Sequence, residues 1–262
     1  MALSLPRKYQ VIGVGVSATT YSETVETVMQ GIRKGQQLVV TAFPVHGVVI
    51  ASQDQALKAK VNSFDIITPD GHPVRWAMNI LYDTRLTDRV YGPELMLRLC
   101  RRVAEEGIGI YLYGSYPHVL DGLHNNLIRM CPNLLILGWE SPPFRPLTPK
   151  EDHEAVAKIN ESGAQIVFLG LGCPLQDNFA FDHRDKIKAT QICVGAAFDF
   201  HAGSKKMAPP WMQRNGLEWL FRLKQEPKRL WRRYLYFNSA FLVKITDQII
   251  RQKFFTRYPL RL

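Results

Sequence analysis

The chain has 262 residues, of which 46% are hydrophobic and 21% are charged. These values fit one large globular domain, or one domain with an appendage, and they exclude a disordered or fibrous chain. The four cysteines lack the spacing of a zinc site, so neither a metal nor a disulfide framework is expected. No apolar stretch is long enough to span a membrane, and Pro6, Arg7 and Lys8 interrupt the N-terminus too early for a signal peptide. We therefore expect a soluble, cytoplasmic protein.

The net charge of +10 is concentrated near the C-terminus. Residues 203–262 contain fourteen Lys and Arg against three acidic residues, a net charge of +11, so residues 1–202 carry −1. Trp, Tyr and Phe alternate with these basic residues. This mixture suits a helix at a membrane surface, a groove for single-stranded nucleic acid, or a solvated basic surface with its aromatics in the core. All three interpretations are open at this point.

Along the first 200 residues, short apolar runs alternate with segments of helical period. Ser22 is the expected N-cap of the first helix, which Gly35 ends. Alternating strands and helices predict an α/β fold whose mainly parallel sheet carries helices on both faces. The strands are expected over residues 9–14, 38–42, 65–68, 109–113, 134–137, 165–171 and 191–194.

Several of these strands end in polar or glycine-containing loops. In open parallel sheets, ligands bind at the carboxyl ends of the strands, where glycines allow close approach and helix N-termini attract phosphate. No Gly-Lys-Ser/Thr sequence is present, so none of the loops is a P-loop. The loops are Thr41-Ala42-Phe43, Pro69-Asp70-Gly71, Tyr113-Gly114-Ser115, Gly170-Leu171-Gly172-Cys173-Pro174 and Gly195-Ala196-Ala197-Phe198-Asp199.

Two side chains in or near these loops could carry chemistry. The carboxylate of Asp70 follows a buried strand directly and could accept a proton from a hydroxyl, or it could instead form an Asx-turn or cap the next helix. Arg89 could bind phosphate through its planar guanidinium, or it could form an ordinary surface ion pair with Asp88 or Glu94. The histidines show no ligand spacing with acidic residues, so we infer no metal site.

A series of motifs gives the chain a resemblance to a known family. Together they span about residues 9–235, and the sequence resembles the WecG/TagA/CpsF family of bacterial glycosyltransferases. The motifs are Thr68-Pro69-Asp70-Gly71-x-Pro-Val-x-Trp76, Arg89-Val90-x-Gly92, Pro143-Phe144, Gly170-Leu171-Gly172-x-Pro174-x-Gln176, Ala197-Phe198-Asp199-x-x-Ala202-Gly203 and a long block from Ala208 to Tyr234 that includes Gly216-Leu217-Glu218-Trp219 and Glu226-Pro227-x-Arg229-Leu230.

The resemblance implies an inverting, metal-independent enzyme with no cofactor. It would move a sugar of the glucose or N-acetylmannosamine type from a UDP-sugar to a polyprenyl-diphosphate-linked saccharide, in the synthesis of bacterial surface polysaccharides. Its implied fold is a Rossmann-like core, here residues 1–203, with a helical appendage, residues 204–262, that contacts an anionic membrane surface. The implied location is the inner face of the cell membrane, with no nucleic acid as partner and a homo-oligomer as an open possibility.

The resemblance also implies roles for individual residues. Asp70 corresponds to the general base, and Thr41, Arg89 and Gln176 to further catalytic positions. Trp219, Trp231 and Arg233 are the expected membrane contacts. The expected substrate-binding residues are Gly71, Gly114, Ser115, Gly172, Pro174, Gly195 and Asp199 in the loops, with Arg222, Arg229 and Arg232 of the appendage directed to the diphosphate.

The chain departs from the family pattern at two positions. Phe43 stands where many members have Asn, which bears on sugar or acceptor contacts. Leu175 stands where most have Lys or Arg, so either a phosphate contact is lost or the position faces solvent; Asp177 replaces a Glu nearby. The segments 44–47, 73–76 and 91–93 lean towards the exopolysaccharide glucosyltransferase branch. Alternatives to the enzyme are a basic nucleic-acid-binding protein and a nucleotide-binding protein without catalysis.

Overall fold

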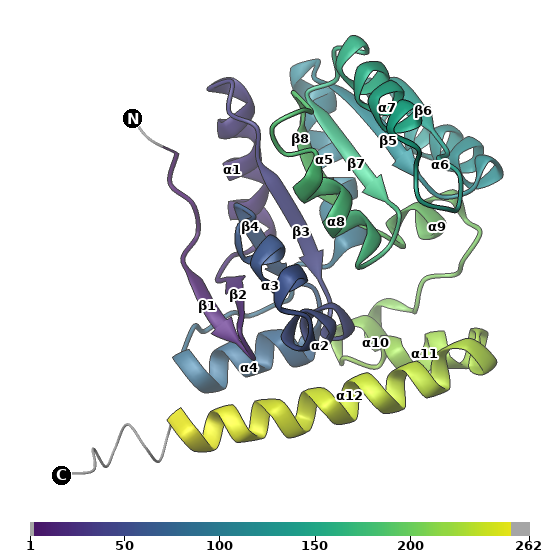
Figure 1. Cartoon of the computed structure of the whole chain (residues 1–262). Helices are drawn as coiled ribbons and strands as arrows, with labels where there is room; N and C mark the ends of the chain where they lie inside the picture. Colours follow the sequence, from purple (N-terminus) through teal and green to yellow (C-terminus); the bar gives the residue numbers. More distant parts are fainter. Residues whose placement is uncertain (1–2, 253–262) are drawn as a thin grey trace.

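A six-stranded parallel sheet, with strand order β4-β3-β8-β7-β5-β6, forms the centre of the molecule (Figure 1). The structure is a computed structural model that describes residues 3–252. The predicted α/β class is confirmed, and the strands agree with the expected runs to within a few residues. They are β3 (Val39–Phe43), β4 (Ile66–Pro69), β5 (Gly109–Gly114), β6 (Leu135–Glu140), β7 (Ile166–Gly170) and β8 (Thr190–Cys193).

The first expected strand is instead an antiparallel hairpin outside this sheet. It consists of β1 (Lys8–Val11) and β2 (Val14–Ser17). The two residues between them, Ile12 and Gly13, have φ angles of 44° and 87°. A turn with two positive φ angles reverses the chain within two residues, so the prediction of one continuous strand over 9–14 was wrong.

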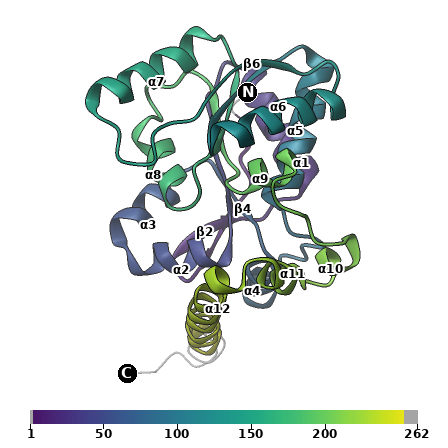
Figure 2. The same ribbon diagram turned by 90° about the vertical axis from the view of Figure 1, so that its right-hand side faces the viewer.

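Helices cover both faces of the sheet, and Figure 2 shows the two layers on either side of the strands. Helices α1, α5, α6 and α9 pack against one face, while α3, α7 and α8 lie on the other. The helices of the core are α1 (Tyr21–Arg33), α2 (Val45–Gln53), α3 (Gln55–Asn62), α4 (His72–Tyr82), α5 (Gly92–Glu106), α6 (Pro117–Met130), α7 (Pro149–Glu161), α8 (Leu175–Asp182) and α9 (Ala197–Ala202).

The first helix begins two residues earlier than its expected cap. Thr20, not Ser22, is the N-cap of α1: its hydroxyl accepts a hydrogen bond from the Glu23 backbone, and the Glu23 carboxylate accepts one from the Thr20 backbone. This reciprocal capping box satisfies two donors that the helix itself leaves free.

The sheet separates two hydrophobic clusters. Successive residues of one strand belong to opposite clusters: Ile66 packs with α1 and α5, whereas Ile67 packs with the β1–β2 hairpin and α2. Phe168 and Leu169 of β7 divide in the same way. Because both faces are buried, each strand is apolar throughout, which explains why its sequence shows a run and no alternation.

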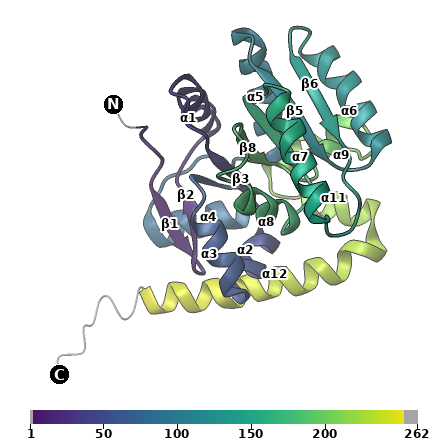
Figure 3. The same cartoon turned by 45° about the horizontal axis from the view of Figure 1, so that its top comes forward.

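The chain ends in an appendage of three helices, α10 (Pro210–Arg214), α11 (Glu218–Gln225) and α12 (Pro227–Ile250). Pro227 starts α12 and so separates it from α11, because a proline is tolerated in the first turn of a helix and not in its interior. Helix α12 runs beneath α2 and α4 (Figures 1 and 3) and buries Leu230, Phe241 and Ile245. The expected domain boundary after residue 203 stays a prediction, and residues 253–262 of the expected appendage lie outside the described residues.

The far end of α12 is fastened to the hairpin by one glutamine. The Gln248 amide donates a hydrogen bond of 2.7 Å to the Gln10 carbonyl, and its oxygen accepts one of 2.7 Å from the Ile12 backbone N–H. The appendage is therefore joined to the core both near the sheet and some twenty residues further along the helix. Gln248 thereby connects the β1–β2 hairpin to the appendage.

Candidate active site

Asp70 lies directly after β4, in the loop that leads to α4. Gly71 occupies the N-cap position of α4 without a side-chain cap, so the Asp70 carboxylate is not used for helix capping. It accepts a hydrogen bond from the backbone N–H of Gly92. Burial, opposed by Arg89, raises the pKa of Asp70 to about 7. A carboxylate with a pKa near neutrality is suited to accept a proton in a reaction at physiological pH.

Arg89 is buried and turns towards the appendage. Its guanidinium forms an ion pair with Glu218 at the start of α11, and it lies over the ring of Tyr91 at 4.1 Å from the centroid. The alternative of a surface pair with Asp88 or Glu94 is excluded: Asp88 accepts the backbone N–H of Arg89, and Glu94 pairs with Arg98. Arg89 is thus fixed next to Asp70, within its electrostatic range.

Helix α11 contributes two charged side chains to the same region. Glu218 accepts hydrogen bonds from Arg89 and from the Tyr91 hydroxyl, the latter at 2.7 Å. One turn further along the helix, Arg222 is half-buried, with its guanidinium 5.5 Å from the centre of the Phe200 ring. Arg222 lies within electrostatic range of Asp70 and lowers its pKa, whereas Glu218 raises it.

Thr41, the expected catalytic threonine, lies in β3 beneath these loops. Its hydroxyl donates a hydrogen bond of 2.8 Å to Asp177 of α8, and both residues are buried. Burial raises the pKa of Asp177 to about 6, and the thiol of Cys173 lies against the same carboxylate. The threonine hydroxyl is therefore held in one orientation by a partner that the sequence analysis did not assign.

Gln176 folds back over the glycine loop that precedes its helix. Its side-chain oxygen accepts a hydrogen bond of 3.2 Å from the Gly172 backbone, and a Cβ at Gly195 would lie 3.3 Å from the same oxygen. Gly172, Pro174 and Gly195 therefore surround one side chain at the ends of β7 and β8. The structure brings these four expected residues together.

The remaining loop residues are placed less uniformly. Gly114 ends β5 with a φ of 123°, and a Cβ there would approach the Gly170 backbone to 2.7 Å, so only glycine fits. The Ser115 carbonyl accepts a hydrogen bond from Ser141, and Asp199 pairs with Lys205 at 3.3 Å. Both of these residues have local structural partners in addition to the ligand roles expected of them.

The appendage residues divide between the site and the surface. Arg229 is exposed and pairs with Glu226, and Arg232 is exposed and lies over the Trp231 ring at 5.2 Å, so neither extends to Asp70 as Arg222 does. Trp219 and Trp231 are both exposed. Arg233, expected at the membrane, is instead half-buried within electrostatic range of Arg222 and Cys173.

The two departures from the family pattern have structural explanations. Phe43 is fully buried, and a Cβ on Gly47 would come within 2.9 Å of its ring, so it packs in the core and does not line the crevice. Leu175 is 67% exposed. The position without the usual cation therefore faces solvent.

Sequence reasoning missed Glu218, Tyr91, Asp177 and His46 as parts of the site. Burial, together with Arg233 and Arg222, lowers the pKa of His46 to about 3, so this histidine is neutral at physiological pH. Glu218 could have been suspected, because it is one of only three acidic residues in a strongly basic segment. Tyr91 stands within the motif that carries Arg89, and Asp177 was noted only as a departure from the family pattern. Nothing in the local sequence indicated a role in the site for either of them or for His46.

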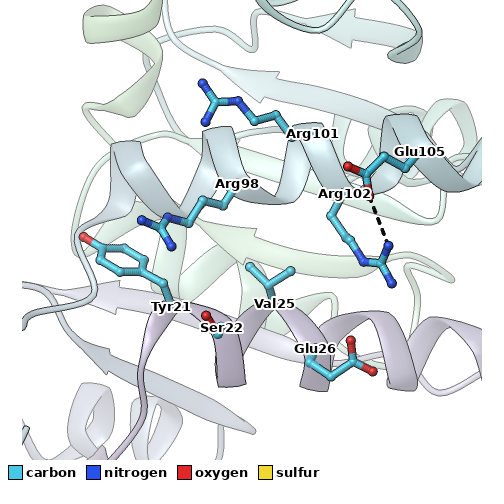
Figure 4. A pocket seen from close by; sticks show the side chains of 8 residues that line it. All are labelled: Tyr21, Ser22, Val25, Glu26, Arg98, Arg101, Arg102 and Glu105. Atoms are coloured by element: carbon cyan, nitrogen blue, oxygen red, sulfur yellow. Dashed lines mark hydrogen bonds and ion pairs between the residues drawn. The ribbon is translucent and has the colours of Figure 1, made fainter.

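Within residues 3–252, no group of three His, Cys, Asp or Glu side chains is arranged to hold a metal ion. A shallow pocket between α1 and α5 contains three arginines (Figure 4). Two of them are paired, Arg98 with Glu94 and Arg102 with Glu105. None of the expected site residues lines this pocket. Among the described helices, none has the length and apolar character needed to cross a bilayer.

Comparison with known proteins identifies the chain. Residues 9–255 match the Glycosyl transferase WecG/TagA/CpsF family. The chain is 31% identical over 199 residues to the N-acetylglucosaminyldiphosphoundecaprenol N-acetyl-beta-D-mannosaminyltransferase of Bacillus subtilis, with 75% of each chain covered. It is 30% identical over 218 residues to the protein of the same name from Bacillus spizizenii, covering 83% of this chain and 81% of the relative.

The α/β fold with its parallel sheet, together with the similarity to these relatives, defines the protein as a glycosyltransferase. The chain belongs to the WecG/TagA/CpsF family, as the resemblance of its motifs predicted. The match extends through the whole of α12, so the appendage is part of what the family shares.

Proposed function

We propose that the protein is an inverting glycosyltransferase that moves a sugar from a UDP-sugar to a polyprenyl-diphosphate-linked saccharide in surface polysaccharide synthesis. The observation that carries this proposal is the part-buried carboxylate of Asp70, whose pKa is about 7 and which lies within electrostatic range of both Arg89 and Arg222. A base and two cations at one end of a parallel sheet match the needs of a reaction in which a hydroxyl is deprotonated and a diphosphate leaves.

In the proposed reaction, Asp70 accepts the proton of the attacking hydroxyl. The hydroxyl oxygen forms a bond to the anomeric carbon, while the bond from that carbon to the diphosphate oxygen breaks and UDP departs with the electron pair. Attack on the face opposite the leaving group inverts the anomeric configuration. A positioned base of this kind typically contributes about 10²–10⁴-fold to the rate.

The departing diphosphate gains negative charge, which the protein must stabilise. Arg222 is the appendage arginine best placed for this, since it is half-buried in the crevice and lies within electrostatic range of Asp70. The N-termini of α2 and α4, which follow β3 and β4, provide further partial positive charge at the same edge of the sheet. We propose that these groups act without a metal ion.

The names of the relatives bear on the substrates. Both relatives are named as transferring N-acetyl-beta-D-mannosamine to an N-acetylglucosaminyldiphosphoundecaprenol. We therefore propose N-acetylmannosamine as the first donor sugar to test, ahead of the glucose that three short segments suggested. The proposed acceptor is a saccharide on a polyprenyl diphosphate.

The appendage supports a role at the membrane surface. Its helices expose large apolar side chains beside basic ones, an arrangement typical of interfacial helices. We propose that this surface contacts the inner face of the cell membrane, where the acceptor is embedded. The exposed apolar residues are Trp219, Leu220, Trp231, Leu235, Tyr236, Leu242 and Val243, and the basic residues among them are Lys228, Arg232 and Lys244.

A transfer assay tests the proposal. The purified full-length chain is incubated with N-acetylglucosaminyldiphosphoundecaprenol and, in turn, UDP-N-acetylmannosamine, UDP-glucose, UDP-N-acetylglucosamine and the UDP-mannosaminuronate donor. Release of UDP and a matching increase in the mass of the lipid product are expected with one donor. The absence of transfer from all four donors to this acceptor would contradict the proposed substrates.

A further inference from the structure

Helix α11 docks on the core through a carboxylate, which is unusual for a short amphipathic helix. Glu218 is the buried residue of this helix, while its apolar neighbours Trp219 and Leu220 are 44% and 46% exposed. An unpaired buried carboxylate would be strongly destabilising, so its position depends on the partners that receive it. The helix is therefore placed by polar contacts more than by apolar packing.

Those partners are two residues of the segment between α4 and α5. Arg89 pairs with one oxygen of Glu218, and the Tyr91 hydroxyl donates a hydrogen bond of 2.7 Å to the other. The Arg89 guanidinium also lies over the Tyr91 ring. Both carboxylate oxygens are thus occupied, and the three side chains form one buried unit that links residues 127 to 129 positions apart in the sequence.

The orientation of α11 determines where Arg222 lies. Positions 218 and 222 are one turn apart on the same face of the helix, so a helix held at Glu218 directs Arg222 to the same side. Arg222 lies over the ring of Phe200 and within electrostatic range of Asp70 and Glu218. The pairing of Glu218 with Arg89 thereby places Arg222 of the appendage within electrostatic range of Asp70.

On this geometry, we propose that Glu218 is a positioning residue of the active site: it orients Arg89 and places Arg222. The inference rests on the proposed function, since it assigns Asp70, Arg89 and Arg222 to sugar transfer. Glu218 itself contacts no reacting atom. Its effect on the reaction passes through the three residues that surround it.

The ionisation of Asp70 supplies a readout specific to this role. The charged or titratable groups within its electrostatic range are Arg89 and Arg222, which lower its pKa, Glu218, which raises it, and the hydroxyls of Tyr21 and Tyr91, whose own pKa values it raises. Removal of the Glu218 charge leaves the two arginines unopposed. The pKa of Asp70 should then fall below its present value of about 7.

The test compares the pH dependence of transfer in Glu218→Gln and wild type. If Asp70 is the base, kcat/KM of the wild type rises with pH up to about 7 and then levels. In Glu218→Gln we expect this rise to occur at lower pH, with kcat reduced at the plateau. Arg222→Gln should move the rise to higher pH, since it removes a charge of the opposite sign.

A double-mutant cycle separates positioning from a general structural role. If Glu218 acts by orienting Arg89, its substitution on an Arg89→Gln background should lower kcat/KM by much less than on the wild type, with a coupling of roughly 2- to 100-fold. Asp247→Asn removes an equal charge from an exposed pair with Arg251 and should leave the pH dependence and kcat unchanged. Glu218→Asp, which keeps the charge, should keep the wild-type pH dependence.

Two results would overturn the inference while leaving the proposed function intact. One is a Glu218→Gln enzyme whose pH dependence coincides with that of wild type; the other is a cycle in which the effects of the two substitutions simply add. Thermal unfolding of each variant shows whether it is folded. If Glu218→Gln is not, Glu218→Asp carries the test through kcat, which should fall because the shorter side chain cannot hold both Arg89 and Tyr91, and a kcat equal to that of wild type would then overturn the inference. A wild-type protein that transfers no sugar would instead contradict the proposed function itself, and this inference with it.

Discussion

The Thr41 hydroxyl donates a hydrogen bond of 2.8 Å to Asp177 Oδ1, across 136 positions of sequence. The bond joins strand β3 to helix α8, which also carries Gln176. Because both partners are buried, neither can exchange the other for water if one is removed. This bond therefore holds β3 and α8 together next to the candidate site.

Removal of either partner should destabilise the fold by a similar amount. We expect Asp177→Ala and Thr41→Val each to lower the free energy of unfolding by about 1–3 kcal/mol, because each leaves a buried polar group without its partner. The double variant should lose less than the sum of the two. Urea unfolding of all four proteins measures the coupling, and strictly additive losses would show that the two side chains act independently.

Asp70→Asn should abolish sugar transfer while preserving the fold. The amide cannot accept the proton of the attacking hydroxyl, so kcat should fall by about 10²–10⁴-fold. Binding of UDP, followed by calorimetry, should change little because Asp70 does not face the leaving group in the proposed reaction. Turnover within a few-fold of wild type would exclude Asp70 as the base.

The same substitution should stabilise the protein in alkaline solution. The folded-state pKa of Asp70 is raised from 3.8 to about 7, so between these pH values the folded state holds a proton that the unfolded state has lost. The free energy of unfolding should therefore fall as pH rises from about 4 to about 7. Asp70→Asn removes this term and should be more stable than wild type at pH 8, by roughly 1–4 kcal/mol.

Unfolding curves at pH 5 and pH 8 test this linkage. The stability advantage of Asp70→Asn over wild type should be larger at pH 8 than at pH 5. Asp88→Asn, which changes a nearby carboxylate, serves as the comparison. An advantage that is equal at the two pH values would show that the carboxyl group is not protonated in the folded protein near neutrality.

Chelation should leave the reaction rate unchanged. In the proposed mechanism Arg222 and the helix N-termini stabilise the departing diphosphate, so transfer should continue at the wild-type rate in excess EDTA. Added Mg²⁺ or Mn²⁺ should not stimulate it. A loss of activity in EDTA that a divalent cation restores would mean that the diphosphate is stabilised by a metal.

Membrane attachment should depend on the exposed face of α12. Trp231→Ser and Leu235→Ser each remove a large apolar side chain that would enter the lipid, worth about 1.5–3 kcal/mol when fully buried, so each should weaken binding to anionic vesicles about tenfold or more. Trp139→Ser, an equally exposed position on the edge strand β6, should bind as the wild type does. If all three substitutions weakened vesicle binding equally, α12 would have no special role in membrane attachment.

Composition and local pattern determined much of this fold. Apolar runs bounded by loops predicted all six strands of the main sheet, since a strand buried on both faces must be apolar throughout. The same pattern could not show that residues 8–17 form a hairpin, because the reversal depends on two positive φ angles and not on a change in polarity. Pro227 marked a helix boundary through its own covalent geometry.

The site required the tertiary structure. Asp70 stood out because it follows a predictable strand, and Arg89 because it lies in a short motif between α4 and α5. The pairing of Arg89 with Glu218, and of Thr41 with Asp177, joins segments more than a hundred residues apart. Such contacts depend on how strands order themselves and how an appendage packs, which no local propensity encodes, because their energy comes from burial that exists only after the chain has folded.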